Sequence, residues 1–523
     1  MKRIISFLLL SYSCLGLSAQ YAGQMDLTFG DQGKVIFQPP EGSSYLRSLK
    51  KSPDGKIYVC GSMELSGGSH GFVARYTYDG QPDGSFNAGN NYVAFQFDGL
   101  STNFNDLVIR SDGKIIVVGT VSVDSYTQHI ALARLLPDGT FDATFGNNGQ
   151  IILSQFNARA SVMTLLYNNA FAVAGSISNG SSNDLCLMGF LPGGNLNTNF
   201  GVNGCQVMDL NADSYDIPGS ITFFNSRILI SSVAGRFDYD AIVLNAFTEL
   251  GQPDAGFGVG GKVVYDGLNL SPSVILYPVS RHAIDGSGRI WVASTFYGLA
   301  SFDGILLRFL SNGTPDNSFG DFGMKVYEFG DADTEFHDIG VQLDGKVVVV
   351  GSWSSLGNNE TLFARFTPDG ELDPQVGSNN TGYIAFSMEA GGSIGDHATR
   401  LMFPWIDKVV VAGFCSLSSS FSWYMTRLYL NVTVGQPEPD PIAEFKLYND
   451  NQSIVLTGNG VSEIKSMRIY DTQGKLLENF ASGIEDFSGG VIRLRPGQPL
   501  ARGFYVLELD KTSGSQRLKF IVP

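Results

Sequence analysis

The stretch Asp142-Ala-Thr-Phe-Gly-Asn-Asn-Gly149 recurs along the chain and decides its architecture. Clear copies begin at Asp26, Asp254 and Asp316, and weaker copies begin at Asp83, Asn197 and Asp373. Successive starts are 57, 59, 55, 57, 62 and 57 residues apart. Self-similarity at a fixed period of this size is typical of a repeat architecture. The sequence therefore predicts seven related units.

Each unit carries signals for four short strands. The Asp-x-x-Phe-Gly turn precedes a strand such as 34–37, and a second strand ends in an Asp-Gly-Lys turn such as 112–114. The third strand is an apolar run closed by glycine, such as 347–351, which suits burial on both faces. The fourth carries Ala-Arg, as at 133–134. This pattern predicts an all-β, seven-bladed β-propeller; the alternative, a parallel β-helix, has coils shorter than this period.

An arginine in the fourth strand precedes the aspartate of the next turn by eight residues in four units. The pairs are Arg75 with Asp83, Arg134 with Asp142, Arg308 with Asp316, and Arg365 with Asp373. A guanidinium on a buried strand needs a carboxylate partner, so we expect structural ion pairs at these positions. Gly189 and Ala246 replace the arginine in the third and fourth units.

The same rule leaves two residues without a neighbour at opposite ends of the repeats. Arg427 has Gly435 eight residues later, and Asp26 has no arginine upstream in the mature chain. Pairing Asp26 with Arg427 would satisfy both. The strand 34–37 would then complete the last sheet, close the propeller and hide the sheet edges.

The units resemble the delta-60 repeat family over roughly residues 24–430. The matching motifs are the Asp-x-x-Phe-Gly turn, the Asp-Gly-Lys turn at 344–346 and the Ala-Arg strand with its closing Asp-Gly at 369–370. The third unit departs from the pattern, because Asn168-Asn169 stands where Asp-Gly-Lys is expected. The resemblance implies a repeat scaffold and no particular activity.

The ends of the chain carry signals for export. Residues 1–19 combine a basic start, a short apolar core and a small-residue cleavage site, as in a secretory signal peptide. No later run is apolar enough for a transmembrane segment.

The formal net charge is −16, which disfavours nucleic acid as a partner because phosphates are repelled.

The tail differs from the repeats in composition and pattern. Residues 434–441 place proline at alternate positions, which predicts a stiff linker. Residues 442–523 contain period-2 strands that predict a small, immunoglobulin-like β-sandwich. The stretches 469–476, 500–506 and 519–522 resemble the type A sorting domain of the Bacteroidetes type IX secretion system. That resemblance implies the secretion machinery as a partner and a secreted or outer-membrane surface location, reached through the periplasm.

Motifs for catalysis and cofactors are weak, so we expect no catalytic set, no metal and no cofactor. The Gly-x-Ser-x-Gly at 391–395 lies in a predicted propeller loop, without the strand and helix that a nucleophile elbow needs. The histidines lack zinc-site spacing, although three of them (His282, His337, His397) stand at or near the second strand of consecutive units. The acidic loop 331–335 remains open as a Ca²⁺ site.

Four cysteines remain after cleavage of the leader, and each stands alone in an apparent strand. Too few for a disulfide framework, they are expected to be small buried side chains. A single closing disulfide between Cys60 and Cys415 stays open as an alternative, because these residues belong to the first and last repeats.

The loops that vary between units hold aromatic residues among Ser, Asn and Gly. Loops before the second strand and after the third strand should emerge on one face, and rigid scaffolds commonly bind through such loops. The predicted binding residues are Tyr126, Tyr215, Phe237, Tyr239, Phe296, Tyr297 and Trp353. Phe104 lies in the same set of segments.

These patterns favour an exported, non-catalytic binding protein of the bacterial surface, with an unknown glycan or protein as ligand. One alternative is a hydrolase or lyase that acts on polysaccharide through carboxylates such as Asp106, Asp338 and Asp396. Another is a purely structural surface component.

Overall fold

The structure, a computed structural model, divides into two compact units, residues 1–434 and 435–523. The first unit is described over residues 21–180, 182–210, 215–235, 240–266, 275–297, 301–330, 332–355, 357–388, 395–404, 407–417 and 420–430. The second is described at its strands. The expected signal peptide 1–19 and the linker 434–441 lie outside the described residues. No helix in the described part is long and apolar enough to span a membrane.

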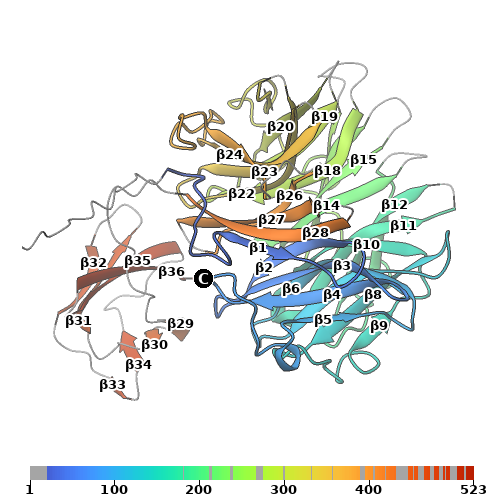
Figure 1. Ribbon diagram of the computed structural model, residues 1–523, viewed down its shortest axis with the longest axis horizontal. Coiled ribbons are helices and arrows are strands. Elements are labelled where there is room, and N and C mark those ends of the chain that lie inside the picture. Colours follow the sequence, from blue (N-terminus) through green and yellow to red (C-terminus); the bar gives the residue numbers. More distant parts are fainter. Residues whose placement is uncertain are drawn as a thin grey trace, which may run out of the picture. The chain divides into compact units, whose positions relative to one another are not determined.

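The first unit contains seven four-stranded antiparallel sheets (Figure 1). Sheet one is β2 (Ser44–Lys51), β3 (Ile57–Leu65), β4 (Gly68–Tyr76) and β5 (Tyr92–Phe95). Sheet two is β6 (Ser101–Ile109), β7 (Ile115–Ser122), β8 (Gln128–Leu135) and β9 (Gln150–Ile152). Sheet three is β10 (Ala158–Leu165), β11 (Phe171–Ser178), β12 (Asn183–Phe190) and β13 (Cys205–Met208). Sheet four is β14 (Asp216–Phe224), β15 (Arg227–Ala234), β16 (Ala241–Thr248) and β17 (Lys262–Asp266).

The remaining sheets follow the same order, and the last one recruits a strand from the start of the chain. Sheet five is β18 (Ile275–Ile284), β19 (Ile290–Tyr297), β20 (Phe302–Phe309) and β21 (Met324–Tyr327). Sheet six is β22 (Asp333–Val341), β23 (Val347–Ser355), β24 (Asn358–Phe366) and β25 (Tyr383–Phe386). Sheet seven is β26 (His397–Met402), β27 (Lys408–Leu417), β28 (Ser420–Tyr429) and β1 (Lys34–Phe37). Two single-turn 3₁₀ helices, η1 (Asn87–Gly89) and η2 (Tyr167–Asn169), complete the described elements of this unit.

The first-listed strand of each sheet lies at the centre of the ring, and we call these seven the axial strands. Each packs against its successor in the order β2, β6, β10, β14, β18, β22 and β26, and β26 packs against β2. This arrangement confirms the predicted seven-bladed propeller. In the seventh sheet β1 pairs with β28, Lys34 opposite Thr426 and Phe37 opposite Trp423, so the blue and orange strands lie side by side in Figure 1.

In five of the seven sheets a glycine closes the apolar run and is required by a β-bulge in the axial strand beside it, whereas Ser232 and Ser294 stand there in sheets four and five. All seven axial strands shift register against their neighbours, as β22 does between Phe336 and Asp338. A Cβ on Gly351 would lie 1.8 Å from the carbonyl oxygen of Glu335, and on Gly413 it would lie 1.8 Å from that of His397. The bulge pushes this carbonyl against the second strand, so no side chain fits there.

The eight-residue Arg–Asp pairs form, and each arginine also binds the next sheet. Arg134 Nε lies 2.8 Å from Asp142 Oδ2, and the same guanidinium donates to Thr144 Oγ1 at 2.9 Å and to the carbonyl of Pro192 at 2.6 Å. Pro192 follows β12 of the following sheet. Arg308 binds Asp316, Ser318 and the carbonyl of Pro368 in the same way.

Two further pairs, Arg75 with Asp83 and Arg365 with Asp373, have Nε to Oδ2 distances of 2.8 and 2.9 Å. The lysine of the Asp-Gly-Lys turn joins the same carboxylate, and Lys114 Nζ lies 2.8 Å from Asp142 Oδ2. Each of these arginines is 4% exposed or less. They therefore connect a strand, a turn and the neighbouring sheet in a region with little solvent.

Arg427 and Asp26 make the corresponding contact between the two ends of the repeats. Arg427 Nε lies 2.7 Å from Asp26 Oδ2, and its Nη1 donates to the carbonyl of Tyr78 in the first sheet at 2.8 Å. Asp26 is fully buried. Burial alone would raise its pKa, but hydrogen bonds from Thr28 and Lys408 and the charge of Arg427 lower it to about 2.

The third and fourth sheets depart from this pattern for different reasons. In the fourth sheet Arg227 of β15 replaces the missing arginine, with Nε 2.7 Å from Asp254 Oδ2 and Nη1 2.6 Å from the carbonyl of Ser311 in the fifth sheet. In the third sheet a Cβ on Gly189 would already lie 2.2 Å from the ring of Phe200. The ring therefore leaves no room for a side chain at the arginine position.

The second unit contains two four-stranded sheets. One has the order β29 (Lys446–Asp450), β30 (Ser453–Thr457), β34 (Val491–Leu494) and β33 (Phe487–Ser488). The other has the order β32 (Leu476–Ala481), β31 (Ile464–Asp471), β35 (Gly503–Lys511) and β36 (Gly514–Val522). The predicted period-2 segments thus form strands.

Replacing Arg427 by alanine should destabilise the first unit strongly, because Asp26 would remain buried without its charge partner. We expect a loss of about 3–5 kcal/mol in the free energy of unfolding. All four tryptophans, at 291, 353, 405 and 423, belong to the first unit, so tryptophan fluorescence during urea unfolding measures it alone.

The control is Lys325→Ala, because Lys325 pairs with Glu371, whose side chain is 75% exposed. Exposed pairs contribute about 1 kcal/mol or less. Equal effects of the two substitutions would contradict the role assigned to Arg427.

Candidate functional site

One face of the propeller collects the starts of the axial strands and the most variable loops. Strands within a sheet alternate in direction, so two kinds of connection emerge together. They join the second strand to the third, as at 123–127, and the last strand to the next axial strand, as at 96–100. We call this side the loop face. The Asp-x-x-Phe-Gly turns lie on the opposite face, since they join third strands to fourth strands.

One residue at or beside the bulge of each axial strand occupies an equivalent position around the axis. Pairing with the second strand of each sheet defines the set as Ser48, Asp106, Val162, Ser220, Arg281, Asp338 and Arg400. Four of the seven are charged, although these strands belong to the innermost layer of the fold. This charge at the axis is unexpected for a position that only packs.

The two acidic residues of this set bind the neighbouring axial strand. Asp106 accepts hydrogen bonds from the Ser48 hydroxyl at 2.6 Å and from the backbone N–H of Met163 at 2.9 Å. Asp338 accepts one from the backbone N–H of Leu401 at 2.8 Å. Each carboxylate therefore links adjacent sheets at the bulge.

The basic residues of the axis behave differently. Arg47 is the bulge residue of β2. The surrounding protein and then the charge of Arg400 lower the pKa of Arg47. Arg47 is nevertheless exposed to solvent. Burial and then the charge of Arg400 lower the pKa of Arg281 to about 9; Asp338, Asp106 and Arg47 also act on it. Arg281 thus responds to charges from four other sheets, which places its guanidinium near the axis.

A histidine pair lies on the same strands, closer to the loop face. His337 contacts Glu335 Oε2 through Nε2 at 2.8 Å and the carbonyl of Ala398 through Nδ1 at 2.8 Å. The ring of His397 stacks on that of His337 at 6.3 Å. Burial and the neighbouring His337 lower the pKa of His397 to about 4, which keeps it neutral.

His282, the third histidine of this set, makes contacts that bind it within the fold. Its Nδ1 contacts the hydroxyls of Ser220 and Ser231 at 2.7 and 3.0 Å, and its Nε2 contacts Thr222 Oγ1 at 3.0 Å. Burial and then the charge of Arg281 lower its pKa to about 3. His282 therefore links β14, β15 and β18 as a neutral side chain.

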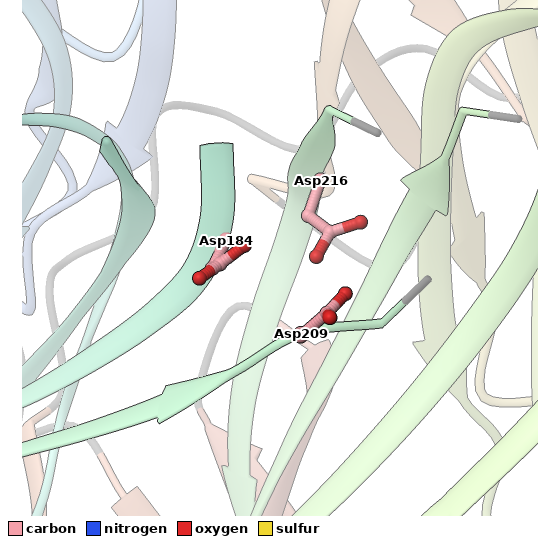
Figure 2. A group of neighbouring side chains, drawn as sticks. All are labelled: Asp184, Asp209 and Asp216. Carbon is pink, nitrogen blue, oxygen red and sulfur yellow. The ribbon is translucent and has the colours of Figure 1, made fainter. Parts of the chain in front are cut away.

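Three carboxylates gather on the loop face between sheets three and four (Figure 2). Asp184, Asp209 and Asp216 each offer an oxygen atom, and these atoms lie within 4.8 Å of one another. Asp216 is buried and accepts the backbone N–H of Leu210 at 2.9 Å. Burial, together with the charges of Asp209 and Asp184, raises its pKa to about 6. Oxygen atoms are the ligands that Ca²⁺ prefers, so this cluster is the candidate cation site among the described residues.

The acidic loop named from the sequence does not gather in this way. Asp333 Oδ1 accepts the backbone N–H of Phe302 at 2.9 Å, and Glu335 binds His337. Asp331 lies outside the described residues.

The predicted binding aromatics divide into exposed and packed side chains. Tyr126, Tyr215 and Tyr297 are 90%, 44% and 42% exposed. Phe296 packs on the core of the fourth and fifth sheets, and Trp353 packs on that of the sixth while its Nε1 donates to the carbonyl of Phe329. Phe237 and Tyr239 lie outside the described residues.

The inclusion of Phe104 among the loop aromatics is wrong. Its side chain is fully buried and packs between the first two sheets, where a Cβ on Gly71 would lie 2.6 Å from its ring. The strand β6 begins before Phe104, and the alternation along it turns this residue away from the axis.

The remaining motifs also have places in the fold. Asp396 is fully buried and accepts the backbone N–H of Met388 at 2.7 Å. The cysteines Cys60, Cys186, Cys205 and Cys415 are buried and free, so the alternative disulfide between Cys60 and Cys415 is absent. The segment 391–394 of the Gly-x-Ser-x-Gly stretch lies outside the described residues.

Sequence reasoning missed the axial arginines because they lie 234 and 119 residues apart, at 47, 281 and 400, with no shared local motif. A usable signal was that Arg281 and Arg400 each lie nine residues before the apolar run of the following strand, and Arg47 ten residues before it. It required knowledge of the bulge, which shifts the alternation by one residue.

Comparison with known proteins supports the fold. Four segments match the family described as a domain of unknown function (DUF5122) beta-propeller, namely residues 52–86, 110–145, 286–319 and 342–375. Each segment contains one of the four Arg–Asp pairs with eight-residue spacing. These matches confirm the propeller repeat in sheets one, two, five and six. No curated protein matches the chain.

Several solved structures are similar at low identity. The polysaccharide lyase Uly1 is 8% identical with a TM-score of 0.46, over 80% of this chain and 93% of that one. A protein of unknown function from Dyadobacter fermentans DSM 18053 is 11% identical with a TM-score of 0.38, over 76% and 98%. The extracellular domains 1–2 of Drosophila Semaphorin 1a are 8% identical with a TM-score of 0.41, over 75% and 87%.

The raised pKa of Asp216 predicts a pH dependence of stability. Its pKa is about 6 in the folded chain and about 3.9 in an unfolded one, so the folded state binds more protons between these values. Stability from this group is therefore present below about pH 4 and is lost as the pH rises through 6. Relative to Asp216→Asn, the wild type should lose on the order of 2 kcal/mol between pH 4 and 7.

Urea unfolding of both proteins at intervals from pH 4 to 7, followed by tryptophan fluorescence, measures this difference. A constant difference between wild type and variant across that range would show that Asp216 does not titrate as stated.

Proposed function

We propose that the chain is an exported, non-catalytic binding protein that acts at a bacterial surface and takes its ligand on the loop face. The observation that carries this proposal is the contrast between two sets of arginines. Those between sheets have carboxylate, hydroxyl and carbonyl partners, whereas Arg47 and Arg281 donate no side-chain hydrogen bond to any described residue. Arg47 lies over the ring of Tyr45, and the guanidinium donors of Arg47 and Arg281 that bond to no described residue are available to a ligand.

The scaffold suits this role because the contacts that make it rigid do not involve the loops of the loop face. The Arg–Asp contacts, with β1 closing the seventh sheet beside β28, leave the loops free to vary. Exposed tyrosines at 126, 215 and 297 lie on the loop face, in sheets two, four and five, and offer flat apolar contact with a polar end. A glycan or a protein surface could use both features.

The carboxylates considered for polysaccharide cleavage have structural partners. Asp106, Asp338 and Asp396 each accept a backbone hydrogen bond from another strand or loop. A general acid or nucleophile must instead direct its oxygen atoms to the substrate. This engagement favours binding over hydrolysis.

Export forms part of the proposal. The leader at residues 1–19 would carry the chain to the periplasm, and the tail at 442–523, with its two sheets, would serve as a type A sorting domain for type IX secretion. The acidic net charge of −16 fits a ligand other than nucleic acid.

Selective binding should depend on the loop face. The full chain is applied to a glycan array with and without EDTA, together with Tyr126→Ala and Tyr297→Ala. We expect retention by one glycan class and a loss of about tenfold or more on either substitution. Loss with EDTA would assign a cation to the Asp184 cluster.

The matched control is Phe322→Ala, because Phe322 is 70% exposed in a turn on the opposite face. Equal loss in Phe322→Ala would contradict a loop-face site. Release of shortened saccharides from a bound polysaccharide would contradict a non-catalytic role.

Removal of residues 435–523 should prevent release from the cell, since the proposed sorting signal lies there. In a host with type IX secretion we expect the shortened chain in the periplasm and the complete chain at the surface or in the medium, as measured by cell fractionation. Equal delivery of the shortened and the complete chain to the surface would contradict a sorting role for residues 435–523.

A further inference from the structure

The arginines of this fold form two populations that differ in their hydrogen bonding. Arg134, Arg308 and Arg427 each use Nε, Nη1 and Nη2 on protein acceptors. Among the axial arginines the single side-chain bond to the described residues runs from Arg400 Nη1 to the carbonyl of Thr399 at 2.6 Å. Arg281 Nε is shielded from solvent and has no partner among the described residues. Arg75 Nε and Arg110 Nε are shielded in the same way, but both of these guanidinium groups bond to protein through their Nη atoms. Arg47 and Arg281 make no such Nη bond to the described residues.

The axial arginines come from three sheets and meet at one level of the ring. Arg281 of β18 and Arg400 of β26 pair with equivalent residues of the second strand, Ala293 and Ala412, and Arg47 occupies the bulge of β2. Arg400 lowers the pKa of both others, which requires the three guanidinium groups to lie within electrostatic range. Three like charges held together cost stability unless a counter-charge joins them.

The nearby acidic groups do not supply enough counter-charge. Both oxygens of Asp106 accept hydrogen bonds, from Ser48 and Leu107 on one side and Met163 on the other, and Lys50 lies 3.6 Å away. Both oxygens of Asp338 accept backbone N–H groups. The axial strands together hold six Lys or Arg and five Asp or Glu, against 34 and 50 in the whole chain. The axial strands thus lack the excess of acidic residues that the whole chain has.

We infer that Arg47, Arg281 and Arg400 form a binding site for an oxyanion group, the carboxylate or sulfate of an acidic saccharide or a free inorganic oxyanion. A guanidinium presents its donors in a planar fork that matches carboxylate, sulfate and phosphate, and three forks from different directions select an anion with several oxygens. Glu335 and His337 lie on the same side of the ring, on β22, and would contact what the oxyanion is attached to. This inference rests on the proposed binding function and names the chemistry of its ligand.

The test measures oxyanion binding to the full chain by calorimetric titration at constant ionic strength. The probes are sodium sulfate, sodium phosphate and an oligouronate, with chloride replacing each in the reference. Wild type should bind at least one of them, and Arg281→Gln and Arg400→Gln should weaken it about tenfold or more, as expected for a lost charge-assisted hydrogen bond. The matched control Arg110→Gln should bind as wild type, because the Arg110 guanidinium pairs with Asp112 and donates to the carbonyl of Pro192 on the face opposite the loop face.

A second readout separates ligand binding from a structural role. In chloride alone, Arg281→Gln should be as stable as wild type or more stable in urea, because it removes a buried like charge that has no partner. Clear destabilisation in chloride would assign Arg281 to the structure and overturn the inference. So would the absence of binding by all three probes, or equal loss in Arg110→Gln.

The probes also identify the source of the oxyanion. Binding of sulfate or phosphate supports a site for the free group, whereas binding of the oligouronate alone supports one that reads the saccharide as well. If these anions bind at the axis while the glycan array stays blank, the inference holds and the proposed surface function fails. If the array is positive and Arg281→Gln binds it as wild type does, the function holds and the inference fails.

Discussion

The propeller depends on one buried contact, between an arginine and the aspartate of the following turn. The arginine belongs to the fourth strand of a repeat unit, which is the third strand of a sheet counted from the axis. Each guanidinium fixes its own turn and reaches a carbonyl of the next sheet, so one residue type sets both the shape of a blade and the angle to its neighbour. A charge in such a dry region is tolerated because a carboxylate pairs with it and a hydroxyl and a carbonyl accept further hydrogen bonds from it. Arg427 repeats the contact with Asp26, 401 residues away in sequence. Acid should therefore weaken the ring as these carboxylates, whose pKa values are lowered, become protonated below about pH 4.

The axial arginines differ from these structural arginines in their hydrogen bonding to the described residues. An arginine that donates to a carboxylate, a hydroxyl and a carbonyl stabilises the fold. Arg281 lies within electrostatic range of Arg400 and Arg47 and bonds to no described residue, so its charge opposes folding. The bulges explain how such residues come to be there, because each bulge changes the side of the strand that the next side chains face. The regular outer strands thus carry the contacts that stabilise the ring, and the irregular axial strands carry the arginines of the proposed binding site.

Much of the fold could be predicted from residues that repeat. The Asp-x-x-Phe-Gly period predicted seven sheets, and the eight-residue spacing predicted the Arg–Asp contacts, since both depend on short-range geometry. What escaped prediction depends on residues far apart. Arg227 replaces a missing arginine from the neighbouring strand, and Asp184, Asp209 and Asp216 meet from three separate elements. Phe104 was misplaced because the sequence does not mark where a bulge changes the alternation. The axial site could not be found without the ring itself.

The most direct measurement is anomalous diffraction from crystals of the chain soaked in selenate, an oxyanion of the shape that the axial arginines should recognise. The account predicts an anomalous peak on the axis, within hydrogen-bond distance of guanidinium nitrogens from Arg281 and Arg400 and bordered by Arg47. Selenate peaks confined to other surfaces, with the axial arginines instead bonded to protein or to solvent, would contradict it.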